Sequence, residues 1–167
     1  MRQEDNRLIW GYGLAPEDER AIRSASASYT LVCHPESNIP VPRCLEDDCP
    51  FLIWIPLSIW TGFASEKRNA ILAESCTQKA ILLDGSPAPE DLEALLDQGI
   101  MCALPRPLRR DDISGIVNKA AELQHLFRDI YNMAREVSLE RELLGRKNAQ
   151  LSFINRFITK ASESLDP

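Results

Sequence analysis

PFLIWIPLSIW, residues 50–60, is an almost wholly apolar stretch that closely follows the acidic residues Glu46, Asp47 and Asp48. It predicts a buried strand over 52–55 that ends at Pro56. Strands this apolar are typical of parallel sheets covered by helices on both faces. Ligands of such sheets bind at the carboxyl ends of the strands. A proline at that position therefore raises the question of what the domain does without a reactive group there.

The whole-chain composition limits the possible functions. A chain of 167 residues with 44% hydrophobic residues suits one compact domain plus an appendage. The net charge of -6 argues against a nucleic-acid-binding protein. No apolar run approaches the roughly 20 residues that span a bilayer, and the N-terminus lacks a signal-peptide core. We expect a cytoplasmic protein with neither nucleic acid nor membrane as a partner.

Short apolar runs alternate with helical patterns up to about residue 110. Pro16 and the acidic residues after it favour a helix start, and Gly99 favours a helix end. The alternation predicts an α/β fold with a five-stranded, doubly wound parallel sheet of flavodoxin-like type. The expected strands cover 7–11, 29–33, 52–55, 80–83 and 101–104, and the expected helices cover 16–27, 65–73 and 87–99.

The C-terminal region predicts a long helical extension, capped by Asp111 or Asp112. From 111 onward the chain has no proline before Pro167. Apolar residues recur there at every seventh position, which is typical of a coiled coil and predicts a homodimer through this helix. We expect an α/β domain over 1–121 and a coiled coil over 122–167. The stripe consists of Ile116, Leu123, Ile130, Val137, Leu144, Leu151 and Ile158.

The second heptad position of this helix is mixed. It holds Leu126, Met133 and Ile154, but also Lys119, Glu140 and Lys147. We expect Glu140 and Lys147 to weaken the dimer locally and to favour a parallel register by pairing between helices. The alternative is a helical hairpin that folds back near Gly145.

The segment GIMCALPRPL, residues 99–108, resembles the end of a response-regulator receiver domain. In that family a glycine closes the fourth helix and a Lys-Pro pair follows the fifth strand. Counting back, AILLDGS, LIWIP and LIWGYG fall where receivers end their fourth, third and first strands. The resemblance covers roughly residues 6–122 and implies a receiver-type fold.

The resemblance also assigns the family's chemical positions, and each one departs from the pattern. Tyr12 and Gly13 stand at the metal-binding acidic pair, and Pro56 stands at the phosphoacceptor aspartate. Asp84 stands at the hydroxyl position and Arg106 at the lysine. An acyl phosphate needs a carboxylate nucleophile and Mg²⁺ needs hard oxygen ligands, and proline supplies neither. We therefore expect a pseudo-receiver without catalytic residues, metal or cofactor, which acts by binding other signalling proteins.

Two further expectations concern the neighbourhood of these positions. The planar guanidinium of Arg106 suits a salt bridge to Asp84 across the former active-site edge, and the alternative is that both are solvated loop residues. Trp60 and Phe63 follow the third strand, and they either contact a partner at the surface or pack under the loop. Residues 143–167 resemble a signalling helix that leads into a GAF-like or other output domain, so we expect the chain to be a fragment of a longer protein.

Two alternative functions stay open. The first is an active response regulator with an unconventional acceptor such as Asp84 or Asp48. The second is a metal or redox sensor built on Cys33, Cys44 and Cys49, with His34 beside them, although five cysteines in irregular spacing favour reduced structural thiols. An enzyme is not expected, because neither His34 nor His125 has an evident nucleophile partner.

Overall fold

The computed structural model describes residues 8–43, 49–85 and 88–163. Five parallel strands form one sheet in the order β2-β1-β3-β4-β5. This order is that of flavodoxin-like sheets, so the predicted fold class is confirmed. The strands are β1 (Leu8–Tyr12), β2 (Thr30–His34), β3 (Leu52–Pro56), β4 (Gln78–Leu83) and β5 (Cys102–Pro105).

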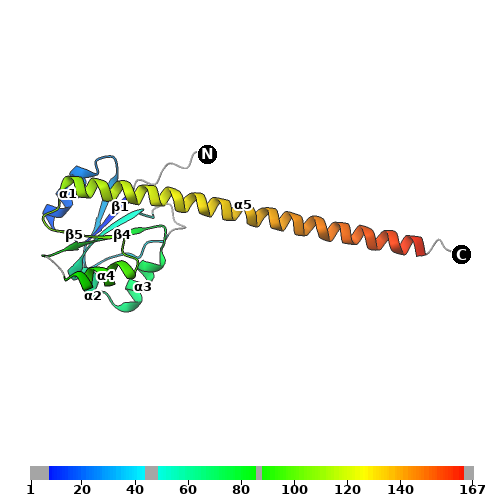
Figure 1. Ribbon diagram of the computed structural model, residues 1–167, viewed down its shortest axis with the longest axis horizontal. Helices are drawn as coiled ribbons and strands as arrows, with labels where there is room; N and C mark the ends of the chain where they lie inside the picture. The colour runs from blue at the N-terminus through cyan, green and yellow to red at the C-terminus, as the bar shows by residue number, and fades with distance from the viewer. Residues whose placement is uncertain (1–7, 44–48, 86–87, 164–167) are drawn as a thin grey trace. The chain divides into compact units, whose positions relative to one another are not determined.

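Helices cover both faces of the sheet (Figure 1). Helix α1 (Pro16–Ala25) and the first turns of α5 (Arg110–Glu163) lie on one face. Helices α2 (Leu57–Gly62), α3 (Ser65–Ala73) and α4 (Pro89–Asp97) lie on the other. Each predicted strand and helix is present, with ends that differ by a few residues.

Two apolar clusters hold these layers together, one on each face of the sheet. Ile22 of α1 and Ile113 of α5 pack with Trp54 of β3. On the opposite face, Ile71 of α3 and Leu95 of α4 pack with the remaining inward side chains of β3 and β4. Every residue of β3 is buried, and β3 is the middle strand of the five, so the apolar stretch 50–60 supplies the centre of the sheet.

Helix α2 was not predicted, and it changes the position of one aromatic residue. The chain turns directly from β3 into this short helix, so Ile59 and Trp60 point into the core and are buried. Of the two alternatives for Trp60, the structure therefore supports packing over a surface contact, because one helical turn directs its indole inward. Phe63 is half-buried, its ring centroid lies 6.1 Å from that of Trp60, and Lys67 Nζ lies 5.0 Å from the Phe63 centroid.

Helix α5 begins at Arg110, so Asp111 and Asp112 lie inside its first turn and neither is the cap that the sequence predicted. Carboxylates in a first turn still favour the positive end of the helix. Ile113, Val117 and Ala120 are its buried residues, and they pack on the sheet as expected.

The chain divides into two compact units, residues 1–125 and 126–167. Helix α5 is continuous through Gly145, so the chain does not turn back there as the hairpin alternative requires. Of the helices in the described ranges, none combines the length and apolarity needed to cross a membrane.

Candidate functional site

The carboxyl edge of the sheet brings together the strand ends where the sequence analysis placed the receiver chemistry. Tyr12, at the end of β1, is fully buried, and its hydroxyl donates a hydrogen bond of 2.7 Å to the Pro40 carbonyl oxygen. Burial raises the pKa of Tyr12, and nearby Cys49 adds to the increase. A phenol kept neutral in this way is a poor metal ligand, because hard cations select anionic or carbonyl oxygens.

Gly13 follows Tyr12 and leaves no room for a side chain. Its φ is +53°, in the left-handed region that favours glycine. A Cβ at this position would lie 2.2 Å from Ile59 Cδ1, so an acidic side chain would require Ile59 to move. The Gly13 amide donates a hydrogen bond of 2.8 Å to the His34 carbonyl oxygen, which ties the ends of β1 and β2 together.

Pro56 ends β3 and is buried. It pairs with Leu82 across the sheet and serves as the N-cap residue of α2. Proline has no backbone N–H and no functional group, so this strand end offers neither a nucleophile nor a donor to an anion.

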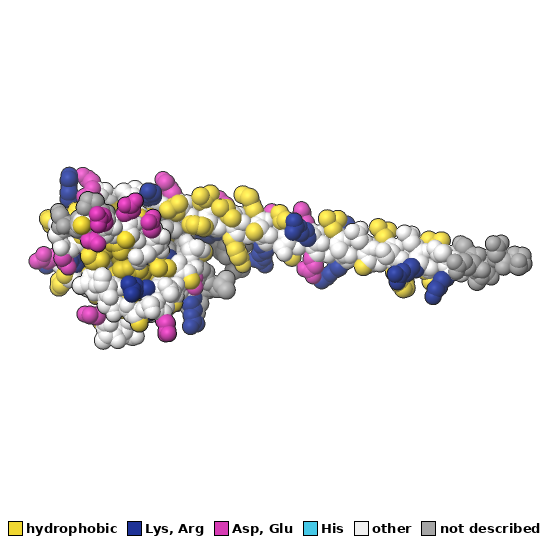
Figure 2. All heavy atoms as spheres, turned by 60° about the horizontal axis from the view of Figure 1, so that its bottom comes forward, with side chains coloured by type: hydrophobic (Ala, Val, Ile, Leu, Met, Phe, Trp, Pro, Cys, Tyr) yellow, Lys and Arg dark blue, Asp and Glu magenta, His cyan; other side chains and the backbone are white. Residues whose placement is uncertain are grey.

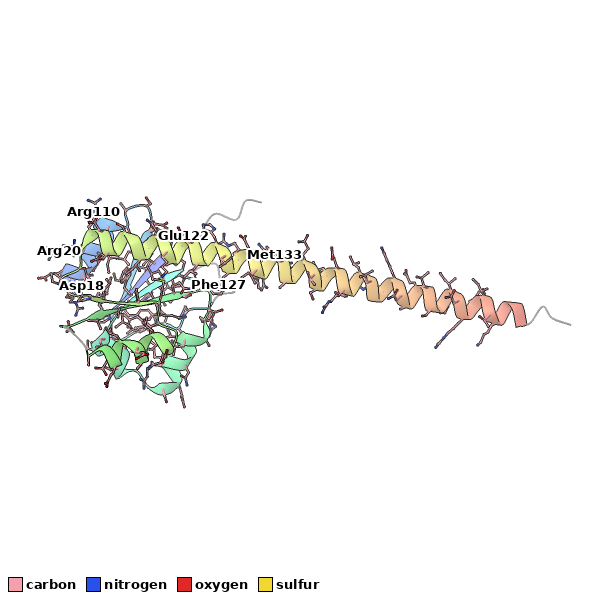
Figure 3. The ribbon with its side chains drawn as sticks, viewed as in Figure 1. Asp18, Arg20, Arg110, Glu122, Phe127 and Met133 are labelled. Atoms are coloured by element: carbon pink, nitrogen blue, oxygen red, sulfur yellow. The ribbon has the colours of Figure 1, made fainter. Side chains whose placement is uncertain are left out.

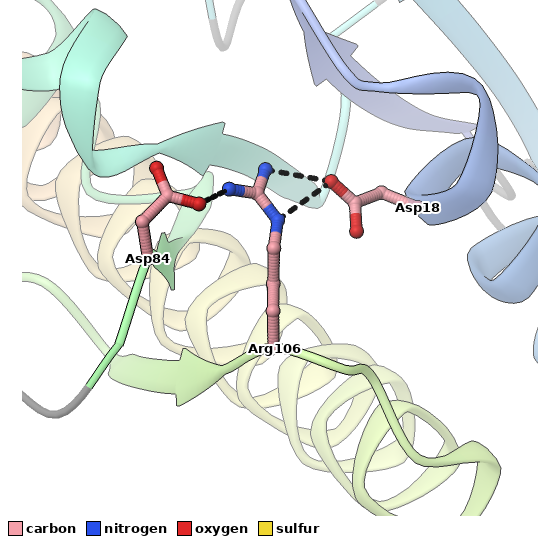
Figure 4. Close-up of polar contacts among 3 residues, drawn as sticks. All are labelled: Asp18, Asp84 and Arg106. Atoms are coloured by element: carbon pink, nitrogen blue, oxygen red, sulfur yellow. Dashed lines mark hydrogen bonds and ion pairs between the residues drawn. The ribbon is translucent and has the colours of Figure 1, made fainter.

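The guanidinium of Arg106, just beyond β5, reaches two carboxylates of this edge (Figure 4). Its Nη1 donates to Asp84 Oδ1, which confirms the predicted contact between these residues. Its Nε and Nη2 donate to Asp18 Oδ2 at 2.9 and 2.6 Å. These hydrogen bonds, that to Asp18 foremost, raise the pKa of Arg106. We call Asp18, Asp84 and Arg106 the edge triad.

Asp18 is the member of the edge triad that the sequence analysis missed. It lies in the first turn of α1 (Figure 3), where an acidic residue was interpreted only as a partner of the helix dipole. Its side chain is 7% exposed, compared with 63% for Asp84. A usable signal existed, because a helix that follows β1 starts at the same edge of the sheet as the ends of β4 and β5.

The charges of this edge limit its chemistry. Both carboxylates face a single guanidinium, so the edge triad carries a net negative charge and its one cation is already engaged. An incoming phosphate would meet two carboxylates and would compete with them for Arg106. Within the described ranges, no three His, Cys, Asp or Glu side chains gather as a metal site requires.

The cysteines proposed for a sensor do not form a site within the described residues. Cys33 lies in β2 and is partly buried, and Cys49 is buried with its sulfur 3.4 Å from Thr77 Oγ1. Cys44 and the alternative acceptor Asp48 lie outside the described residues. Burial raises the pKa of Cys33, and it raises that of Cys102 to about 11, which disfavours reactive thiolates.

His34 closes β2 beside an aromatic group. Its ring lies edge-on to Trp10, with centroids 4.7 Å apart. Its Nε2 is buried and has no hydrogen-bond partner within the part of the chain that the structure describes. Burial lowers the pKa of His34, so the neutral ring is favoured. The other histidine, His125, is exposed on α5.

The helical stripe has two different environments. Ile116 packs partly buried against the core. The stripe positions of the second unit, Ile130, Val137, Leu144, Leu151 and Ile158, are 51–59% exposed. Met133 is also exposed and projects from the helix (Figure 3), and Figure 2 shows hydrophobic side chains recurring along this part of α5. So many exposed large apolar residues on one helix indicate an interaction surface.

Comparison with known proteins places the fold in a class. No protein-family model matches the chain, and no curated protein matches it. Solved structures do match, and they define the fold as that of CheY-like response-regulator receiver domains.

One such structure is a CheY-like response regulator from Mesorhizobium loti, with 13% identity and a TM-score of 0.54, covering 69% of this chain and 98% of that one. A second is an adenylate cyclase from Rhodopirellula baltica, with 11% identity and a TM-score of 0.57, covering 78% and 98%. A third fuses residues 181–211 of the yeast Spc42 trimeric coiled coil to another protein, with 15% identity and a TM-score of 0.50, covering 86% and 95%. At these identities the similarity establishes the fold alone.

Proposed function

We propose that this protein is a cytoplasmic signal-transduction module of two-component type whose receiver-like unit is not phosphorylated. In this proposal it is not an enzyme, and it acts by dimerising through α5 and by binding other signalling proteins. The observation that carries the proposal is the edge of the sheet, where β3 ends in the buried Pro56 and Arg106 is held between Asp18 and Asp84.

Phosphoryl transfer needs a nucleophile, a divalent cation and positive charge on the transferred group. Pro56 supplies no nucleophile, and Tyr12 and Gly13 supply no carboxylate for Mg²⁺. The positive charge of Arg106 is present but is hydrogen-bonded to both carboxylates of the edge triad. The nucleophile and the metal ligands are therefore absent and the positive charge is engaged, so restoring one group leaves the other two requirements unmet.

The direct test is incubation of the protein with a small acyl-phosphate donor and Mg²⁺, followed by intact-mass measurement. We expect no phosphorylated species, while an active receiver domain in the same reaction serves as the positive control. The Pro56→Asp variant is expected to stay unphosphorylated too, because Tyr12 and Gly13 still leave Mg²⁺ without acidic ligands. Phosphorylation of the native chain would refute the proposal, and peptide mapping would then locate the acceptor at Asp84, Asp48 or elsewhere.

The exposed stripe supports the second part of the proposal, a homodimer through α5. Coiled-coil association would bury the apolar side chains that recur from Ile130 to Ile158. A change in the α/β unit that alters the pairing of the two helices would then reach a further domain along α5. That this domain is GAF-like stays a prediction. The structural match to a chain that carries a coiled coil is consistent with such an extension.

Molar mass in solution tests the homodimer. Val137→Asp and Leu144→Asp together place four like charges in the seam of a dimer, so we expect the variant to be a monomer. The matched control is Ser138→Asp, which adds a charge at an exposed position next to the stripe and should remain dimeric. A native chain that is monomeric at micromolar concentration would refute this part of the proposal.

A further inference from the structure

We propose that the two α5 helices of the homodimer run antiparallel, with Glu140 of each chain paired to Lys147 of the other, which reverses the parallel register expected from the sequence. This inference deepens the proposed function and rests on its helix-mediated homodimer. The surface concerned is the exposed seam of the second unit, formed by the two heptad positions that face a partner. The seam consists of Leu126, Ile130, Met133, Val137, Glu140, Leu144, Lys147, Leu151, Ile154 and Ile158.

The seam is apolar except at Glu140 and Lys147, which are consecutive residues of the second heptad position. Glu140 and Lys147 occupy the heptad position that Met133 and Ile154 occupy on either side. Both charged side chains are exposed in the single chain, and a seam partner would cover them. The orientation of the partner therefore determines which charges meet there.

In a parallel dimer, each seam residue faces its own copy. Glu140 would face Glu140 and Lys147 would face Lys147, which places two like-charged layers in the seam. Glu140 and Lys147 of different chains would be seven residues apart, or about 10 Å along the axis. The parallel form gains a rim pair between Glu136 and Arg141, but exposed pairs of this kind contribute little.

In an antiparallel dimer, each residue of the stripe, such as Leu144, faces a residue of the second heptad position, such as Glu140, in the partner. Aligning Leu144 with Glu140 of the second copy aligns Val137 with its Lys147. The apolar layers then match without exception: Ile130 faces Ile154, Leu151 faces Met133, and Ile158 faces Leu126. No layer holds two charged residues.

The same alignment brings the opposite charges close. Glu140 and Lys147 of different chains are then offset by only three residues, or about 4.5 Å along the axis. Their side chains span such a distance across a seam, and two symmetric ion pairs form. The antiparallel form places opposite charges side by side, whereas the parallel form places like charges face to face. This difference favours the antiparallel form.

One exposed leucine outside the seam is also accounted for. Leu143 is 57% exposed and lies next to the seam on the flank of the helix. In antiparallel coiled coils each flanking position faces its equivalent in the partner, so the two Leu143 side chains meet near the two-fold axis on one flank. On the other flank the two Arg141 side chains come level at the exposed rim, where water screens their charges. In a parallel dimer the same leucine would lie beside Asn148.

Distances between spin labels on the full chain test the orientation. An encoded ketone amino acid carries the label, which leaves the five native cysteines untouched. One label replaces Glu142, which lies on the outer face of the helix, level with the two-fold axis of the antiparallel form and level with its own copy in the parallel form. The other replaces Lys160, whose copies are about 54 Å apart in the antiparallel form and within about 30 Å in the parallel form.

We expect a short distance at position 142 and the long distance at position 160. Short distances at both positions would overturn the antiparallel proposal while leaving the homodimer intact. Absence of any dipolar signal at both positions would mean a monomer, and the homodimer of the proposed function would fail together with the orientation.

Charge exchange gives an independent measurement. In the antiparallel form, Glu140→Lys places lysines beside lysines and should raise the dissociation constant at least about tenfold. Adding Lys147→Glu to the same chain restores opposite charges and should return the constant to near its native value. A parallel dimer keeps like charges facing in all three proteins, so equal constants for all three would overturn the proposal.

Discussion

Replacing Arg106 by methionine is expected to destabilise the α/β unit through Asp18. Methionine keeps much of the length of the arginine stem, so the change removes mainly the charge and the hydrogen bonds. Asp18 is 7% exposed and would lose its bonds of 2.6 and 2.9 Å. Breaking a fully buried pair costs about 3–5 kcal/mol. Because a quarter of Arg106 is exposed, water can partly replace it, and we expect a loss of about 2–3 kcal/mol.

Asp84→Asn is the matched control for this prediction. Asp84 contacts the same guanidinium but is 63% exposed, so its loss should cost less than about 1 kcal/mol. Asp18→Asn removes the buried charge, so adding Arg106→Met to it should cost less than Arg106→Met costs alone. The difference between these two costs, a coupling energy of about 1–2 kcal/mol, measures the interaction of Asp18 with Arg106.

Urea unfolding at fixed protein concentration measures these differences, with fluorescence of the buried Trp54 and Trp60 as the probe. In thermal unfolding the same loss corresponds to a decrease in Tm of roughly 5–10 °C for a domain of this size. The reasoning is refuted if Arg106→Met costs no more than Asp84→Asn. Asp18 would then be solvated well enough to need no partner.

Three smaller predictions concern other groups of the α/β unit. Burial lowers the pKa of His34, so its contribution to the free energy of unfolding is complete above about pH 6.5 and is lost as the pH falls through the lowered value. His34→Phe should flatten this part of the stability profile measured between pH 5 and 7, and an unchanged slope would contradict the prediction. Gly13→Asp should destabilise the unit by about 1–3 kcal/mol, because of its positive φ and the contact with Ile59, and Mg²⁺ titration should show no gain in binding. Burial raises the pKa of Cys102 to about 11. At pH 8 this thiol should therefore react with iodoacetamide at least about 100-fold more slowly than in the urea-unfolded chain. Peptide mass mapping measures both rates, and similar rates would show that the thiol is accessible and ionised.

The fold could be predicted from the sequence because its signals are local. Runs such as 52–55 and 80–83 are buried on both sides. Helix starts such as that at Pro16 are marked by a proline followed by acidic residues. Their order along the chain then restricts the sheet to a few topologies. The short helix α2 lacked such a signal, since it follows β3 without a turn and its apolar residues continue those of the strand.

The site was only half predictable, because its contacts join distant parts of the chain. Arg106 and Asp84 follow neighbouring strands, so strand order was enough to bring them together. The contact between Arg106 and Asp18 spans 88 residues and depends on how α1 starts over the sheet edge. The acidic residues Glu17, Asp18 and Glu19 are equivalent as partners of a helix dipole, and only the rotation of the helix selects Asp18 for burial.

The edge triad has a consequence for how a signal could enter such a protein. Arg106 connects the end of β5 to the end of β4 and to the start of α1 through contacts that need no ligand. A ligand shifts a conformational equilibrium only by its differential affinity for the two states. Because Arg106 is already bonded to both carboxylates, an anionic input at this edge would have to displace them, and under the proposed function we place the input elsewhere. The seam of α5 meets this requirement, because its association depends on concentration and on the charges of Glu140 and Lys147. Glu140→Lys alone should therefore alter signalling in proportion to the change in the dissociation constant, adding Lys147→Glu should restore it, and Asp84→Asn should leave it unchanged.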